Sequence, residues 1–302
     1  MGIGISTLRR TFDEVSRRGN ITRKELSAII GVSEVSAGRA VDALVRAGLL
    51  SLYKGTSNGR TADIISVSDE RLCLLIDLCG RGVSFAVSAP RAIVSNVQSI
   101  PFLHMRDTDA NISIALSDVV RYIKSNGISP DAVAVAIPNT PGAPDPKSFT
   151  SALAACGLRA DTVVSGSEAA CRYFKENSTE SDSFAFLSID PVIWGCSSAE
   201  PCRMLEWGKI KVGAHHGESF ESVLSYDTDE AHLKIYLERA LTSINAVLSP
   251  DRIFVSSSFL PSSVMDVISK LPNAEDVSGS TPVMRGLLRF AKDRLFEKFI
   301  LN

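Results

Sequence analysis

The segment 20–67 constrains the fold more than any other part of the chain, because helix patterns, a tight turn and a hairpin signal follow one another there. Its first helix is expected from about Thr22 to Ile30, with one apolar face. Gly31 follows, and it suits the positive φ of a residue that ends a helix in a tight turn. Ser33 then stands at the N-cap position, where its side chain can accept a backbone N–H of the next helix.

The second helix of this segment has two contrasting sides. Its apolar stripe follows the i, i+4, i+7 spacing and consists of Ala37, Val41 and Leu44. The other side carries short or polar residues and is expected to face outward: Glu34, Val35, Ser36, Gly38 and Arg39. A helix with one apolar stripe and a small-residue outer face suits close approach to the major groove of DNA.

A β-hairpin is expected directly after the second helix. Gly48 ends that helix, and two short apolar runs over 49–53 and 64–67 flank a polar stretch. Asn58-Gly59 in this stretch is a strong hairpin signal, and Arg60 follows it. A cation at the tip of a hairpin can reach backbone phosphates or a narrow minor groove. The segment therefore predicts a winged helix-turn-helix.

This winged head is expected to bind double-stranded DNA, and a small helical domain that binds protein or links other parts is the alternative. Residues 1–68 hold ten Lys and Arg against six Asp and Glu, so the head carries +4 and the remainder of the chain −6. A basic head on an acidic body confines attraction for phosphate to the head. The expected DNA contacts are Thr22, Arg23, Ser33, Glu34, Val35, Ser36, Arg39, Asn58, Gly59 and Arg60.

Composition narrows the class of protein. The chain has 302 residues, 45% of them hydrophobic and 22% charged, which fits a small head and a larger bilobed body. We expect no membrane span, since no run approaches the roughly 18 apolar residues that one needs. The N-terminus lacks the pattern of a signal peptide, and the six cysteines are scattered without a Cys-x-x-Cys pair. These features predict a cytoplasmic protein with reduced thiols.

Past residue 68 strands and helices alternate. Strands are expected over 72–77, 83–88, 132–137, 162–164, 184–189, 193–197, near 210–212 and over 252–255, and helices over 112–125, 168–175, 228–248 and 284–299. Because strand–turn–strand followed by strand and helix occurs twice, the pattern predicts a duplicated α/β body with a cleft between two lobes. The expected domains are the head over 1–68, a first lobe over 69–175 and a second lobe over 176–302, with a C-terminal helix that can return to the first lobe.

The chain resembles regulators of the ROK family (repressors, open reading frames and sugar kinases). In the head the resemblance rests on Gly31-Val-Ser-Glu-Val-Ser-Ala-Gly-Arg39, Ala47-Gly-Leu-Leu50 and Asn58-Gly-Arg60; in the body it rests on Leu75-Ile-Asp77-Leu-Cys-Gly80, Ala134-Val-Ala-Ile-Pro138 and Leu248-Ser-Pro-Asp-Arg-Ile-Phe-Val255. The resemblance implies a winged head joined to an actin-like, ribonuclease H-like sugar-kinase fold, and a homodimer that binds an operator.

Departures from the family pattern predict that the body is not an enzyme and needs no cofactor. The phosphate loops of the family correspond to Asp77-Leu-Cys79-Gly80-Arg81 and to Asp190-Pro191-Val192-Ile-Trp194, and the glycines after the late strand correspond to Ser256-Ser-Ser258. In the first loop Cys79 and Arg81 stand in place of a glycine that lets a backbone amide approach phosphate and a threonine that donates a hydroxyl, and the second loop has a carboxylate and a proline where phosphate should lie. The family's general base falls in Ser165-Gly166-Ser167-Glu168, where Gly166 replaces the Asp.

The resemblance also implies where an effector would bind. Its ligand stretches correspond to Ser165, Ser167, Glu168 and His216. Glu218, two residues after His216, can substitute for the family's missing acid, and Asn139 follows the strand that ends at Pro138. Asp77 is either a ligand carboxylate or a cap of its own turn. The family's zinc signature is missing, because Cys196 and Cys202 precede His215 and His216 without metal-like spacing, and no metal is expected.

Three hypotheses stay open. The first is a dimeric transcription regulator, a repressor by analogy, whose body binds a sugar or sugar derivative. The second is an active sugar kinase with a DNA-binding head. The third is a regulator whose body serves only as a dimerisation or partner platform. The first and third differ only in whether the cleft binds a small molecule, which the residues leave open.

Overall fold

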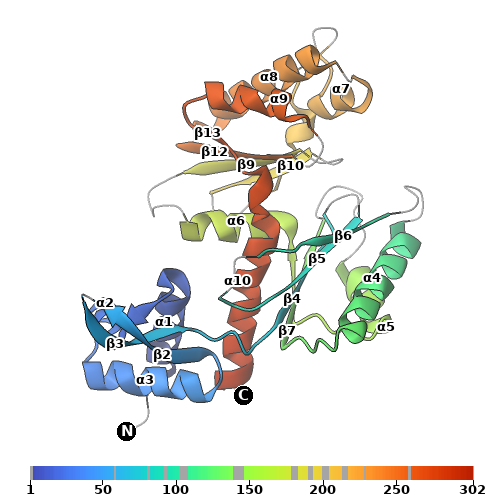
Figure 1. Ribbon diagram of the computed structural model, residues 1–302. Coiled ribbons are helices and arrows are strands. Elements are labelled where there is room, and N and C mark those ends of the chain that lie inside the picture. Colours follow the sequence, from blue (N-terminus) through green and yellow to red (C-terminus); the bar gives the residue numbers. More distant parts are fainter. Residues whose placement is uncertain are drawn as a thin grey trace.

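The computed structural model describes most of the chain. Its residues are 3–57, 59–79, 82–91, 94–102, 108–138, 146–177, 183–189, 193–198, 204–212, 217–227, 229–257 and 260–301. Three sheets organise them, one in the N-terminal part and one in each half of the body. Figure 1 shows the N-terminal part beside the lower lobe, the second lobe above it, and the red helix α10 running between them.

The N-terminal part has three helices and a three-stranded antiparallel sheet. Its elements are α1 (Ile5–Arg18), β1 (Ile21–Thr22), α2 (Arg23–Ile30), α3 (Glu34–Arg46), β2 (Leu50–Ser57) and β3 (Arg60–Val67), with strand order β1-β3-β2. The predicted turn is confirmed, since Gly31 adopts φ 67° and Ser33 caps α3. Helix α1 was not predicted, although Leu8, Phe12 and Val15 repeat at helical spacing and Phe12 and Val15 are buried.

The two sheets of the body repeat one topology. The first has the order β6-β5-β4-β7-β8 and the second β11-β10-β9-β12-β13. In each, the first strand lies in the middle, two antiparallel strands follow on one side and two parallel strands on the other. The predicted duplication of the body is therefore confirmed at the level of the fold.

The first sheet comes from β4 (Cys73–Asp77), β5 (Gly82–Ser88), β6 (Gln98–Pro101), β7 (Ala132–Ile137) and β8 (Thr162–Ser165). Helices α4 (Thr108–Ser125) and α5 (Pro146–Ala155) contribute to the same apolar core as one face of this sheet. The residues of β7 are buried throughout, as expected of a parallel strand covered on both faces. Strand β6 and helix α5 were not predicted.

The second sheet comes from β9 (Phe184–Ile189), β10 (Ile193–Ser197), β11 (Met204–Leu205), β12 (Arg252–Ser257) and β13 (Ala274–Asp276). Helices α7 (Phe220–Tyr226), α8 (Glu230–Leu248) and α9 (Ser262–Met265) pack on its outer face. The strand predicted near 210–212 is wrong. The Ile210 N–H bonds to the Trp207 carbonyl in a turn, and Lys211 forms only an isolated bridge with Ser219.

Helices α6 (Gly166–Asn177) and α10 (Pro282–Phe296) form the layer between the two sheets (Figure 1). Phe174 of α6 stacks on Phe254 of the second sheet with 4.2 Å between ring centroids. On the side of this layer that faces the first sheet, α10 packs on β4 and β7. The C-terminal helix α10 thus lies on the first sheet, and it continues as a π-helix over Glu297–Leu301.

The same helix also reaches the N-terminal part. Phe296 of α10 packs on Phe12 of α1 with 5.7 Å between ring centroids, and one apolar core joins both elements. The N-terminal part is therefore packed against the body through buried aromatic rings. No described helix is both long and apolar enough to span a membrane.

Helices α6 and α10 cross with almost no space between their backbones. A Cβ added to Gly286 would stand 1.8 Å from the Ala169 carbonyl oxygen. Gly286→Ala should therefore lower the free energy of unfolding by about 1–3 kcal/mol, the usual cost of overpacking, despite the better helix propensity of alanine. Urea denaturation of the full chain measures this change. Gly279→Ala, where an added Cβ meets nothing within 4 Å, is the matched control, and equal midpoints for both variants would contradict the crossing.

Candidate functional site

The exposed side of α3 holds most of the residues predicted to contact DNA. Ser33, Glu34, Val35, Ser36 and Arg39 are all exposed, and Val35 presents 66% of its surface to solvent. The Ser33 hydroxyl accepts the Ser36 N–H at 3.2 Å and begins the helix at this end. The start of α3 thus offers two hydroxyls, one aliphatic side chain and, one turn later, a guanidinium.

Gly38 does not belong to this exposed side, so the prediction that it faces outward is wrong. It is buried, because α2 lies against it: an added Cβ would stand 3.2 Å from Nη1 of Arg23. Arg23 in turn pairs with Asp42 of α3 at 2.8 Å. Gly38 therefore leaves room for the Arg23 side chain of α2 to lie across α3, and its position is not open to DNA.

Thr22 and Arg23 are occupied by contacts within the N-terminal part. Thr22 caps α2 and does not lie inside it: its hydroxyl accepts the Glu25 N–H at 3.2 Å, and its own N–H donates to Glu25 at 2.8 Å. The Thr22 N–H, and next the Thr22 hydroxyl, donate to the Glu25 carboxylate and lower its pKa. Arg23 keeps 37% of its side chain exposed while it pairs with Asp42. Thr22 therefore begins α2, and Arg23 joins α2 to α3.

The predicted hairpin forms between β2 and β3. Its strands pair from Leu50↔Val67 to Ser57↔Arg60, and Gly59 at the tip adopts φ 75°. Asn58 and the side chain of Arg60 lie outside the described residues. Lower in the hairpin, Lys54 and Asp63 form an exposed ion pair at 2.6 Å.

The predicted effector residues Ser165, Ser167 and Glu168 come together at the start of α6. Ser165 caps this helix, since its hydroxyl accepts the Glu168 N–H at 3.1 Å and its N–H donates to Glu168 at 2.8 Å. Glu168 is exposed, whereas Ser167 is only 1% exposed and contacts the Ser165 hydroxyl at 3.0 Å. In this structure Ser167 is therefore covered, and of these three residues a ligand could reach only Ser165 and Glu168.

The turn after β4 packs against the start of α6 and against the second sheet. Asp77 accepts the Cys79 N–H at 2.8 Å, which is the turn-capping role that the sequence left open. A Cβ added to Gly166 would stand 2.5 Å from Sγ of Cys79 and 3.6 Å from the Trp194 ring. Residues from three of the four stretches that depart from the family pattern therefore converge, and the Cys79 and Trp194 side chains fill the space beside Gly166.

The other effector predictions are not brought into this cluster by the described residues. Glu218 is half-buried next to α7, and its carbonyl accepts the Val212 N–H at 2.9 Å. Asn139, His216 and the stretch 190–192 lie outside the described residues. Among the described part of the chain, no group of three or more His, Cys, Asp and Glu side chains could hold a metal. Cys73, Cys79, Cys156, Cys171 and Cys196 are free thiols.

A junction between the N-terminal part and the body was not predicted from the sequence. Arg71 spans it, donating to the Ala47 carbonyl at 3.1 Å and to Asp131 at 3.0 Å while its guanidinium lies 3.8 Å from the Phe299 ring centroid. Arg9 of α1 pairs with Asp13 of the same helix and with Asp293 of α10. The only signal in the sequence was Arg71, which follows the predicted domain boundary at residue 68.

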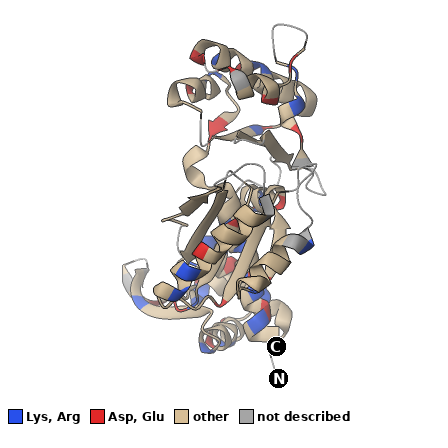
Figure 2. Ribbon diagram, turned by 90° about the vertical axis from the view of Figure 1, so that its right-hand side faces the viewer, with Lys and Arg blue, Asp and Glu red and all other residues tan. Residues whose placement is uncertain are grey.

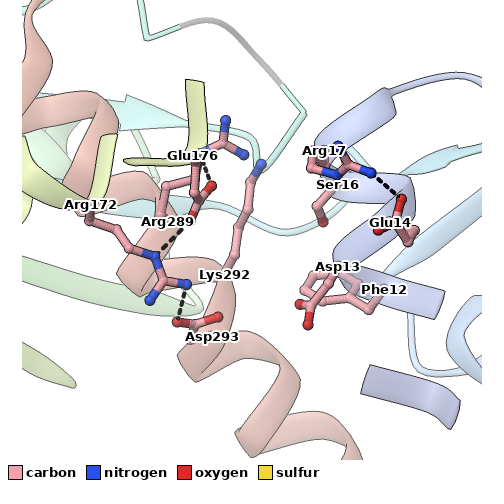
Figure 3. Close-up of a pocket in the computed structure, with 10 residues that line it drawn as sticks. All are labelled: Phe12, Asp13, Glu14, Ser16, Arg17, Arg172, Glu176, Arg289, Lys292 and Asp293. Carbon is pink, nitrogen blue, oxygen red and sulfur yellow. Dashed lines mark hydrogen bonds and ion pairs between the residues drawn. The ribbon is translucent and has the colours of Figure 1, made fainter. Parts of the chain in front are cut away.

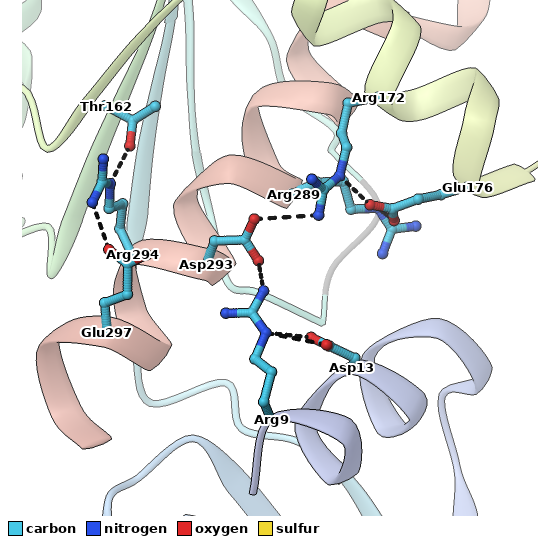
Figure 4. Close-up of polar contacts among 9 residues, drawn as sticks. All are labelled: Arg9, Asp13, Thr162, Arg172, Glu176, Arg289, Asp293, Arg294 and Glu297. Carbon is cyan, nitrogen blue, oxygen red and sulfur yellow. Dashed lines mark hydrogen bonds and ion pairs between the residues drawn. The ribbon is translucent and has the colours of Figure 1, made fainter. Parts of the chain in front are cut away.

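The Arg9–Asp293 pair continues into the body as a chain of ion pairs (Figure 4). Arg172 of α6 contacts Asp293 at 3.2 Å and Glu176 at 2.6 Å, and Arg289 of α10 contacts Glu176 at 3.0 Å. Positive and negative groups are interspersed over the helices of the body (Figure 2). Partly buried networks of this kind restrict the orientation of the elements that they join.

A cavity of about 250 Å³ opens beside this chain, between α1 on one side and α6 and α10 on the other (Figure 3). Lys292 of α10 points into it and is only 7% exposed. Burial, and next the neighbouring Arg289 guanidinium, lower the pKa of Lys292 from 10.5 to about 8. A second hollow of about 610 Å³ lies on the first lobe near Asp131, Asp161 and Lys298. Neither is lined by a predicted effector residue.

Comparison with known proteins identifies the fold. The ROK family transcriptional regulator described as a homolog of the E. coli MLC protein is 16% identical and matches 98% of this chain and 97% of its own, with a TM-score of 0.62. The inorganic polyphosphate/ATP-glucomannokinase from Arthrobacter sp. strain KM is 13% identical over 74% of this chain and 98% of its own, with a TM-score of 0.59.

A ROK family glucokinase from Streptomyces griseus, solved with glucose and AMPPNP, is 12% identical over 74% of this chain and 99% of its own, with a TM-score of 0.50. No protein-family model and no curated protein matches the sequence. The chain therefore shares the fold of ROK regulators and ROK sugar kinases.

Burial of the Lys292 ammonium has a measurable consequence for stability. The folded chain holds this proton less tightly than the unfolded chain, so the group's contribution to the free energy of unfolding rises between about pH 8 and 10.5. The nearby groups that influence the pKa of Lys292 are Arg289, Glu176, Cys73 and Asp293. Burial raises the pKa of the Cys73 thiol to about 12.

Lys292→Met should therefore raise the free energy of unfolding by up to about 3 kcal/mol at pH 7, because it removes a buried charge, and this advantage should shrink from pH 8 to 10. Denaturation of both proteins in a phosphate-free buffer across this range measures the difference. The exposed Lys270 supplies the control variant Lys270→Met. A destabilised Lys292→Met protein at pH 7 would show that the ammonium is compensated.

Proposed function

We propose that the chain is a DNA-binding transcription regulator whose residues 1–68 form a winged helix-turn-helix. The body over 69–175 and 176–302 serves as its effector and dimerisation module. The observation that carries this proposal is the exposed side of α3, which begins at the Ser33 cap and lies away from the core. The proposed location is the cytoplasm, where operator DNA is accessible.

The chemistry of α3 suits the major groove. Ser33 and Ser36 can donate to phosphate or to base edges, and the exposed Val35 can contact a thymine methyl group. Arg39 lies one turn later on the exposed side and can reach a guanine edge or a flanking phosphate. The hairpin of β2 and β3 places Arg60 next to its tip, as a wing requires, and the head carries a net charge of +4.

The comparisons support the regulator over the kinase. Both kinases are matched almost in full by about three quarters of this chain, and the quarter left over is close to the length of the head. The regulator is matched by 98% of the chain, which includes most of the head. A DNA-binding role thus accounts for a part of the chain that the kinases do not need.

As a regulator the chain would act as a homodimer, a repressor by analogy, with two copies of α3 in successive major grooves about 34 Å apart or a multiple of it. A sugar or sugar derivative remains the proposed effector, held near Ser165, Glu168 and the stretches that contain Asn139, His216 and Glu218. If the cleft holds no ligand, the body would act only as a partner platform.

Sugar kinase activity is the second candidate, because the ROK glucokinase shares the fold. The geometry at Gly166 speaks against it. Phosphoryl transfer needs a base for the attacking hydroxyl and a cradle for the triphosphate. Gly166 supplies no base, and the Cys79 sulfur and the Trp194 ring occupy the space that a side chain would need. We therefore propose that the body has no catalytic activity and no cofactor.

The DNA-binding proposal predicts different losses for two arginines. Arg39→Ala should weaken binding to a duplex selected in vitro by the full chain by about 1–3 kcal/mol more than binding to random DNA. Arg60→Ala should weaken both duplexes by a similar factor and reduce the salt slope by about one, as for a phosphate contact. Fluorescence anisotropy over a salt series measures both effects.

Arg121→Ala is the matched control, since Arg121 is an exposed arginine on α4 of the body that pairs with Asp118 at 2.7 Å. It should leave binding unchanged. Two chains per selected duplex are expected in the same titrations. Wild-type affinity in the Arg39→Ala and Arg60→Ala proteins would contradict the head as the DNA-binding part.

The absence of kinase activity is tested by ATP consumption over a panel of hexoses and amino sugars. Neither the wild-type chain nor Gly166→Asp should show sugar-dependent turnover, and Gly166→Asp should unfold more easily because its side chain would overlap Cys79. Gly279→Asp, in open space, is the control for stability. Turnover by the wild type that Asp77→Ala abolishes would establish the kinase instead.

A further inference from the structure

The cavity between α1 and the pair α6 and α10 is small and lined with polar side chains (Figure 3). Its volume of about 250 Å³ lies below the roughly 300–1,000 Å³ that is typical of pockets for drug-sized ligands. Any occupant must therefore be small. The walls come from three helices, so an occupant would touch the N-terminal part and the body at once.

Lys292 is the group that most needs an occupant. Its side chain is only 7% exposed, and no described residue accepts a hydrogen bond from it or forms an ion pair with it. Lysine is almost never buried to this extent without a partner, because removing an ammonium from water is costly. In Figure 3 its amine points between Arg289 on one side and Ser16 and Arg17 on the other.

The lining has four carboxylates and four cations, and Lys292 is the one described lining cation that forms no ion pair. Glu14 is held by Arg17 and Arg18, Glu176 by Arg172 and Arg289, and Asp293 by Arg9 and Arg172. Asp13 pairs with Arg9. Each lining carboxylate thus already has a guanidinium partner, while the Lys292 ammonium has none among the described residues. The buried hydroxyl of Ser16 also finds no partner there.

We propose that this cavity binds a phosphate group, either free phosphate or the phosphate of a small monoester. The Lys292 ammonium offers three donors, Ser16 adds a hydroxyl from the opposite wall, and the Arg289 guanidinium lies beside the amine. These donors converge from more than one plane, which suits a tetrahedral oxyanion better than a planar carboxylate. A dianion would also offset the repulsion between Lys292 and Arg289.

The bound phosphate group joins α1 to α10, because Ser16 and Lys292 lie on opposite walls. It therefore holds the N-terminal part in one orientation on the body. The consequence for operator affinity rests on the proposed DNA-binding function, whereas phosphate binding does not. Binding is accordingly measured without DNA, so that failure of one proposal leaves the other testable.

The experiment titrates the full chain at pH 7 with sodium phosphate, glucose 6-phosphate or glucose, with ionic strength matched by sodium chloride. Phosphate should raise the melting temperature in a saturable manner that chloride does not reproduce. Calorimetry gives the dissociation constant, and hydrogen exchange should show slower exchange in α1 when phosphate is bound. A stronger effect of glucose 6-phosphate identifies a monoester as the ligand, and equal effects identify free phosphate.

Lys292→Met should weaken phosphate binding at least about tenfold, the usual range for a hydrogen bond to a charged group. Ser16→Ala, which removes only an unpartnered hydroxyl, should fold normally and bind more weakly than the wild type. Lys270→Met should bind as the wild type does. The proposal is overturned if chloride reproduces the stabilisation, if Lys292→Met and Ser16→Ala respond fully, or if glucose alone acts as glucose 6-phosphate does.

Discussion

The close crossing of α6 and α10 is the contact on which the rest of the structure depends. Gly286 brings the backbone of α10 against the Ala169 carbonyl of α6, and this pair of helices fills the space between the two sheets. One side of the layer packs on β4 and β7, and the other stacks Phe174 on Phe254. A residue from the end of the chain thus determines how two lobes built from earlier segments are held together.

The same helix explains why the N-terminal part is not an independent appendage. Phe296 packs on Phe12, and Arg71 bonds to the Ala47 carbonyl while it stacks on Phe299. Apolar burial provides the attraction at this junction, and the ion pairs around Asp293 restrict its geometry. A change in the body can therefore reach α1 through side chains in direct contact, as a regulator would require.

In the region between the lobes, side chains of the chain contact one another. Asp77 is used to cap its own turn, and Cys79 lies against Gly166 and close to the space next to Trp194. The packing beside Gly166 is tight, so a larger side chain at this position would need its neighbours to move. The polar atoms that remain, those of Ser165 and Glu168, bond to each other at the start of α6.

The sequence by itself determined the local features: the Gly31 turn, the Ser33 cap, the β2–β3 hairpin and most strands of the duplicated body. Each depends on neighbouring residues, whose propensities and periodicity are written in the chain. Only the tertiary structure decided that Gly38 is covered by Arg23, that Ser167 is buried and that Lys292 points into a cavity. Those outcomes depend on contacts between distant segments, because burial and pairing of a side chain are set by the elements that pack against it, and a local pattern does not specify them.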